Sequence, residues 1–99
     1  MESEARTWSE VYERGGYEGL LAACRNDVPY YIAFEDDMPG VAEYLAAEAA
    51  NDCLAGADEE RDDLFNRLYA DVLEWAEGHA ELVMAGAARI AAALGMKAA

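Results

Sequence analysis

Hydrophobic positions recur at helical spacing over the second half of the chain. From about residue 58 to residue 95 they keep the helical period, and the phase is not lost at Gly78. We therefore predict one long C-terminal helix over this range, straight or kinked at that glycine. The positions on its stripe are Leu64, Leu68, Val72, Trp75, His79, Leu82, Val83, Gly86, Ile90 and Leu94.

The length of this predicted helix has a consequence for packing. At about 1.5 Å per residue it would span roughly 55 Å. A folded monomer of this size is only about 30 Å across. The helix would therefore either protrude from the molecule or pack against a second copy of the chain.

Two short helices are predicted at the N-terminal side. The first begins at the capping box Thr7-Trp8-Ser9-Glu10 and ends at Gly15-Gly16. The second covers residues 17–25 and ends at Asn26-Asp27. The residues on its apolar face are Tyr17, Leu20, Leu21 and Cys24.

Residues 28–34 allow two interpretations, because they are both β-branched and aromatic. They form either an edge strand that awaits a partner's strand or a helix opened by Pro29, with Asp27 as its cap. The helix is favoured, since the sequence contains no second candidate strand with which the first would pair.

A further helix is predicted from Asp37, its cap, to about Leu54, with Pro39 in the first turn and Gly56 beyond its end. Its predicted buried face contains Val41, Tyr44, Leu45, Ala49 and Cys53. The sequence thus predicts one all-α domain over residues 1–99, a small bundle of about four helices with a long C-terminal helix.

Composition bears on whether this domain folds. Large aliphatic residues are few and the net charge is high, a combination typical of disorder. Two tryptophans, six tyrosines and many alanines argue for a folded helical domain with a thin core. Cys24 and Cys53 are expected to be small buried apolar residues, although the sequence leaves open whether they pair.

Charge divides the chain into two parts. Acidic residues number 21 against 7 basic ones, which gives a net charge of −14 and disfavours direct binding to nucleic acid or to an anionic membrane. Residues 1–81 hold all 21 acids and five bases, a net charge of −16, and form an acidic body. Residues 82–99 hold two bases and no acid, and form a neutral helix end rich in small residues.

Small residues in this helix end repeat at intervals of four, as at Ala87, Ala91 and Gly95, which permits close approach of another helix. That helix belongs either to the same chain or to a second copy. We predict a homodimer seam, and its residues are Leu82, Val83, Gly86, Ala87, Ile90, Ala91 and Leu94.

Acid pairs such as Glu74 with Glu77 invite an enzymatic interpretation, because carboxylates three residues apart on a helix can hold magnesium. The basic residues that would bind a phosphate substrate are few, since Lys97 is the one lysine of the sequence. His79 lies on the apolar stripe and has no glutamate three residues before it, as a di-iron site requires. We therefore expect no enzyme, no cofactor and no metal.

Acids gather beside aromatic residues in the middle of the chain. This pattern predicts a surface that binds a basic protein, because a charge of this density destabilises the compact state unless a partner compensates it. The predicted partner-binding residues are Tyr30, Tyr31, Glu35, Asp36, Asp37, Glu43, Glu48, Asp52, Asp58, Glu59, Glu60, Asp62 and Asp63. Phe34 accompanies the two tyrosines.

The chain resembles the small acidic helical inhibitors made by phages and mobile elements. The features that carry this resemblance are its length, its scarcity of lysine, and the clusters Glu35-Asp36-Asp37 and Asp58-Glu59-Glu60-Arg61-Asp62-Asp63. These inhibitors are the anti-CRISPR proteins and the DNA-mimic anti-restriction proteins, which share no motif. The resemblance implies a non-enzymatic inhibitor whose partner is a basic nucleic-acid-binding protein such as a Cas effector. An acidic adaptor or antitoxin-like protein that neutralises a basic partner without DNA mimicry is the alternative.

The location follows from the same sequence. Three of residues 1–6 are charged, no apolar signal segment follows them, and the apolar stretch 82–96 is short and contains Arg89. We expect the protein in the cytoplasm of a host bacterial cell.

Overall fold

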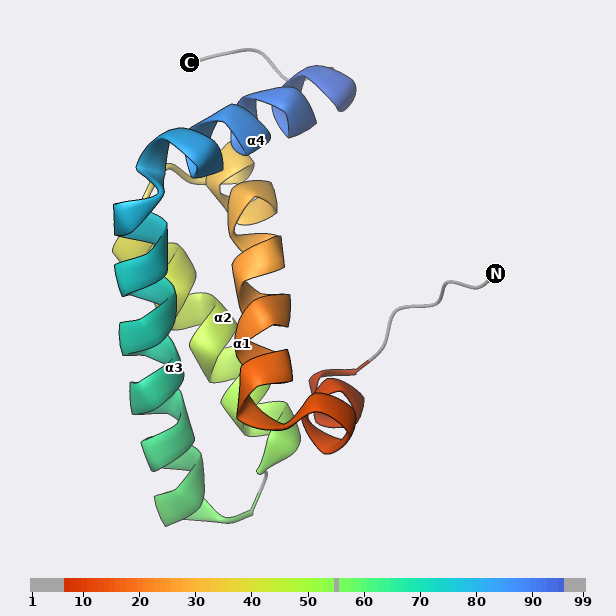
Figure 1. Ribbon diagram of the computed structural model, residues 1–99, viewed down its shortest axis with the longest axis vertical. Coiled ribbons are helices and arrows are strands. Elements are labelled where there is room, and N and C mark those ends of the chain that lie inside the picture. The colour runs from red at the N-terminus through yellow and green to blue at the C-terminus, as the bar shows by residue number, and fades with distance from the viewer. Residues whose placement is uncertain (1–6, 55, 96–99) are drawn as a thin grey trace.

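The computed structural model describes residues 7–54 and 56–95. Within these ranges the chain forms four helices and no strand, so the predicted all-α bundle is confirmed (Figure 1). The helices are α1 (Trp8–Phe34), α2 (Met38–Cys53), α3 (Asp58–Gly78) and α4 (Ala80–Ala93).

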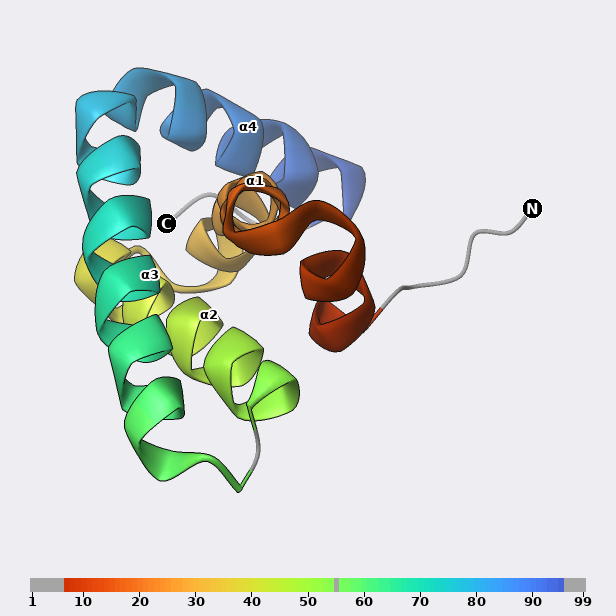
Figure 2. The same cartoon turned by 60° about the horizontal axis from the view of Figure 1, so that its bottom comes forward.

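α1 begins where the capping box predicts. The Thr7 hydroxyl accepts a hydrogen bond from the Glu10 backbone N–H at 3.1 Å. The helix is interrupted at Gly16, whose φ of 65° and ψ of −159° suit a residue without a side chain. The predicted break at Gly15-Gly16 is therefore confirmed, and the segment before it turns away from the rest of α1 (Figure 2).

Beyond Gly16, α1 continues to Phe34 without a further break, so the predicted end at Asn26-Asp27 is wrong. The helical interpretation of residues 28–34 is confirmed and the edge strand is excluded. A proline inside a helix costs about 3 kcal/mol. Burial of Val28 and Ile32 contributes about 1.5–3 kcal/mol each, which offsets the cost of Pro29.

α2 follows the sequence closely. The Asp37 carboxylate accepts a hydrogen bond from the Gly40 backbone N–H at 3.2 Å, and Pro39 lies in the first turn. Its buried face is built mostly of alanine, which allows α2 to lie close to its neighbours. The prediction that Tyr44 lies on the buried face is wrong, because its side chain is 48% exposed.

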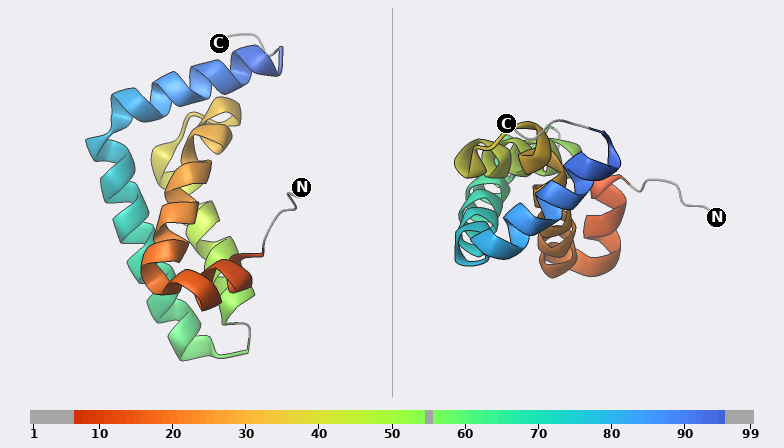
Figure 3. Two further views of the ribbon diagram at one scale, coloured as in Figure 1. Left: turned by 45° about the vertical axis from the view of Figure 1, so that its right-hand side comes forward. Right: turned by 90° about the horizontal axis from the view of Figure 1, so that it is seen from above.

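The predicted long C-terminal helix is wrong. The chain leaves helical geometry at His79, with φ −125° and ψ 35°, so that α3 ends at Gly78 and α4 starts at Ala80. α4 is 14 residues long and lies across the C-terminal end of α1 (Figure 3). A straight helix would leave Val83 and Ala87 in solvent, whereas the turn buries both in the core.

The core is centred on α1, which packs against each of the other three helices (Figure 2). α4 contacts mainly α1, and α2 packs between α1 and α3. Within the described residues no polar or charged residue is buried. The core is therefore entirely apolar, and every described acid retains contact with solvent.

The close approach of α4 to α1 is testable at Gly86. A Cβ atom there would lie 3.1 Å from the Pro29 Cβ, so Gly86→Leu should lower the free energy of unfolding by about 1–3 kcal/mol through overpacking. Chemical denaturation followed by circular dichroism measures the change.

Gly78→Leu is the matched control, because a Cβ at Gly78 would meet no atom within 4 Å. Leucine is the better helix former, so this variant should be as stable as the parent chain or more stable by up to about 1 kcal/mol. Equal effects of leucine at the two glycines would contradict the packing of α4 on α1.

Candidate partner-binding surface

The eleven acids predicted to bind a partner are all exposed. They lie in the connection between α1 and α2, at exposed positions of α2, and in the first turns of α3. The two densest groups, 35–37 and 58–63, lie at opposite ends of α2. Because α2 has 16 residues, these groups are separated by a helix about 24 Å long.

Three of these acids also maintain the local fold. Asp37 caps α2, and Asp52 accepts a hydrogen bond from the Ser9 backbone N–H at 2.9 Å, which joins the end of α2 to the start of α1. Asp58 pairs with Arg61 across 3.1 Å. Within residues 7–54 and 56–95, the other eight form no ion pair or side-chain hydrogen bond: Glu35, Asp36, Glu43, Glu48, Glu59, Glu60, Asp62 and Asp63.

An exposed aromatic cluster lies beside the first acid group. The Tyr30 ring is 5.2 Å from that of Tyr31 and 5.1 Å from that of Phe34, both in edge-on contact. Tyr44 of α2 completes the cluster, with its ring 5.2 Å from Tyr31. Tyr30 is 46% and Phe34 55% exposed, which is unusual for side chains of this size.

Tyr44 belongs to this exposed cluster, although the sequence pattern predicted it to be buried. It follows the buried Val41 by three residues and directly precedes the buried Leu45, so its spacing alone matched the predicted buried stripe. The chain reverses direction at residues 35–37, and this reversal brings Tyr44 beside Tyr31. The reversal could be placed there only once α1 was known to continue as a helix to Phe34.

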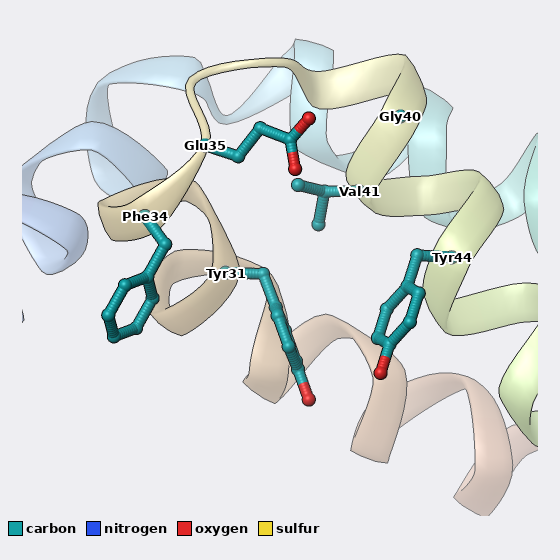
Figure 4. Close-up of a pocket in the computed structure, with 6 residues that line it drawn as sticks. All are labelled: Tyr31, Phe34, Glu35, Gly40, Val41 and Tyr44. Atoms are coloured by element: carbon teal, nitrogen blue, oxygen red, sulfur yellow. The ribbon is translucent and has the colours of Figure 1, made fainter.

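A hollow of about 160 Å³ opens between the end of α1 and the start of α2. Figure 4 shows the Tyr31 and Tyr44 rings side by side and the Glu35 carboxylate extending from the connection toward Val41. Burial, followed by the nearby Tyr44, raises the pKa of the Tyr31 phenol, so the ring is neutral. The lining residues are Tyr31, Phe34, Glu35, Gly40, Val41 and Tyr44.

The face between α1 and α3 holds arginines against aromatic rings. The Tyr17 hydroxyl donates to the Asp71 carboxylate at 2.6 Å, and the Arg67 guanidinium carbon lies 3.8 Å from the Tyr17 ring centre. Burial raises the pKa of Tyr17, and the hydrogen bond to Asp71 adds to the shift. This group joins α1 to α3.

Farther along the same face, the Arg25 guanidinium lies 5.8 Å from the Trp75 ring. Trp75 stacks on His79 with ring centres 5.1 Å apart, and the Trp75 carbonyl lies 2.8 Å from His79 Nδ1. His79, which was predicted to lie on the apolar stripe, is therefore exposed at the α3–α4 turn, where it packs on one aromatic ring.

Burial also shifts the pKa of three further titratable groups, two cysteines and one aspartate. It raises the pKa of the Cys24 thiol to about 12 and that of Cys53 to about 11, and neither cysteine forms a disulfide. Both thiols are protonated at neutral pH and are weak nucleophiles. Burial also raises the pKa of the Asp27 carboxyl, one turn before Tyr31.

The predicted dimer seam is divided by the fold. Val83, Gly86 and Ala87 are buried against α1 within one chain. Leu82 is 58% and Leu94 55% exposed, while Ile90 and Ala91 are half-buried. Intramolecular packing thus accounts for three of the seven positions, and the homodimer stays a prediction for the remainder.

Comparisons of the chain with models of protein families, with curated proteins and with solved structures found no match. Among the described residues, no helix is both long and apolar enough to cross a membrane. In the same part of the chain, no three histidines, cysteines or acids lie close enough together to hold a metal ion. Statements about function therefore depend on the surface of this chain.

The structural role of Asp52 separates it from the other acids. Asp52→Ala should lower the free energy of unfolding by about 1 kcal/mol, because the Ser9 N–H at the start of α1 loses its acceptor. Glu48→Ala removes the same charge one turn earlier on α2 and should change stability by less than about 0.5 kcal/mol. Urea denaturation of both variants checks this, and equal values would rule out the capping role.

Proposed function

We propose that the protein is a non-enzymatic inhibitor that binds a basic nucleic-acid-binding protein, such as a CRISPR–Cas effector in the cytoplasm of a host bacterium. The observation that supports this is the high density of exposed carboxylates over residues 35–63. This segment contains eleven acids and one base, a net charge of −10. Eight of the acids have no ion pair or side-chain hydrogen bond within the described part of the chain.

Such a surface suits a partner that normally binds phosphates. Exposed carboxylates repel one another, and a cationic groove that covers them removes this repulsion while it releases its own counterions. Two acid groups at opposite ends of α2 allow contacts about 24 Å apart, comparable with several phosphates along one strand. Association would be fast and would weaken steeply with salt.

A charge-reversal experiment tests the proposal. The variant Glu35→Lys, Asp36→Lys, Glu43→Lys, Glu48→Lys leaves the capping acids Asp37 and Asp52 in place. Because it replaces attraction by repulsion, it should bind the partner at least about tenfold more weakly. The partner is captured from a bacterial lysate with the tagged protein at low salt and released at high salt, and affinity is then measured with the purified partner.

The matched control reverses four exposed acids outside this surface, by Glu13→Lys, Glu18→Lys, Glu74→Lys and Glu77→Lys. Its net charge equals that of the variant at 35–48, but its acids at residues 35–63 are unchanged. It should therefore bind the partner more tightly than the variant at 35–48. Duplex DNA should compete with the parent protein for the partner. Equal binding of the two variants would refute a localised acidic contact surface.

The exposed aromatic cluster supports a second candidate, an acidic adaptor or antitoxin-like protein that neutralises a basic partner without DNA mimicry. Aromatic anchors contribute more to such interfaces than rim charges do. Under this alternative, Tyr30→Ala with Phe34→Ala should weaken binding at least about tenfold while duplex DNA does not compete. Competition by DNA together with an unchanged affinity of the aromatic variant would exclude the adaptor.

A further inference from the structure

We propose that the hollow between α1 and α2 binds the guanidinium group of an arginine side chain of the basic partner. The inference rests on the proposed function, since it names the group of the partner that the acidic surface would receive. It depends on the geometry of Tyr31, Phe34, Tyr44 and Glu35.

The size of the hollow selects a side chain over a larger ligand. Sites for cofactors and drug-sized molecules enclose roughly 300–1,000 Å³. The volume here is about 160 Å³ and the hollow opens on the surface beside Phe34, which is 55% exposed. One side-chain head inserted from a partner therefore fits, whereas a nucleotide or a flavin would not.

The lining of the hollow favours a cation. Three aromatic side chains present π-systems, whose faces are negative, and the Glu35 carboxylate extends over the same space (Figure 4). The lining residues contribute no positive charge. An anionic group would be repelled by Glu35, and an apolar group would remove water from that carboxylate without replacing its hydrogen bonds.

Arginine suits this lining better than lysine. A guanidinium is planar, so it can stack on a ring while its N–H groups donate to a carboxylate at the edge. The lysine ammonium is strongly hydrated and has no plane with which to stack. The combination of several rings with one carboxylate therefore matches the chemistry of arginine.

The chain itself contains the same combination with an arginine bound. On the α1–α3 face the Arg67 guanidinium lies 3.8 Å from the Tyr17 ring centre, and the hydroxyl of that ring donates to Asp71. A tyrosine, a carboxylate and a guanidinium thus assemble between two helices of this fold. The hollow between α1 and α2 has tyrosines and a carboxylate but no guanidinium of its own, and a partner's arginine would supply it.

The test uses the full chain and two probes, an oligoarginine peptide and an oligolysine peptide of equal length and charge. Isothermal titration calorimetry measures affinity, and NMR follows the ring resonances of Tyr31, Phe34 and Tyr44. The parent chain should bind oligoarginine at least about threefold more tightly than oligolysine, with shifts of these resonances. Equal affinities, or unshifted ring resonances, would overturn the assignment.

Two variants test whether the preference for oligoarginine over oligolysine arises at the hollow. Tyr44→Leu removes one ring but keeps an apolar side chain, and Glu35→Gln removes the carboxylate charge without changing its shape. Each should reduce the preference for oligoarginine to about twofold or less. Glu77→Gln, an exposed acid on α3, makes the same charge change as Glu35→Gln and should weaken both peptides equally, leaving the preference intact. Loss of the preference in this control, or its retention in both site variants, contradicts the proposal.

The outcomes also separate this inference from the proposed function. If the acidic surface is no partner-binding surface, neither peptide will bind at physiological salt and both ideas fail. If only the arginine assignment is wrong, both peptides will bind with salt-dependent and equal affinity. The lysate capture at low salt then still reports on the basic partner.

Discussion

The arrangement of this protein depends on the buried stripe of α1. Leu20, Cys24, Val28 and Ile32 are four residues apart and all lie in the core. The other three helices each pack against this helix, and α4 has few contacts elsewhere. Since every buried residue in the described part of the chain is apolar, apolar contact centred on this stripe holds the helices together. The small residues of α2 and α4 follow from it, because they let the helices approach closely.

The same stripe determines which side chains remain outside. With Val28 and Ile32 turned inward, Tyr30 and Phe34 are directed outward on the same helix. The continuation of α1 through Pro29 carries these aromatics to the connection at 35–37, where the chain reverses and brings Tyr44 beside Tyr31. The aromatic cluster and the neighbouring acids are therefore consequences of how α1 packs.

Acids serve two purposes in this surface. Asp37 and Asp52 satisfy backbone N–H groups at helix starts, where a negative charge is also favoured by the helix dipole. Glu43 and Glu48, on the outer face of α2, make no such contact within the described residues. Composition alone cannot distinguish these two groups, because a capping carboxylate and a contact carboxylate are identical until the backbone around them is in place.

The sequence by itself determined the features that depend on neighbouring residues: the all-α class, the start of α1 at Thr7, its break at Gly16 and the cap of α2 at Asp37. Each follows from the backbone and side chains within a turn of the residue. The continuity of α1 through Asn26-Asp27, the turn at His79 and the place of Tyr44 were decided only by the tertiary structure. In each of these cases, burial against a distant helix outweighs or redirects the local preference, and a periodic pattern does not state which helix it packs against.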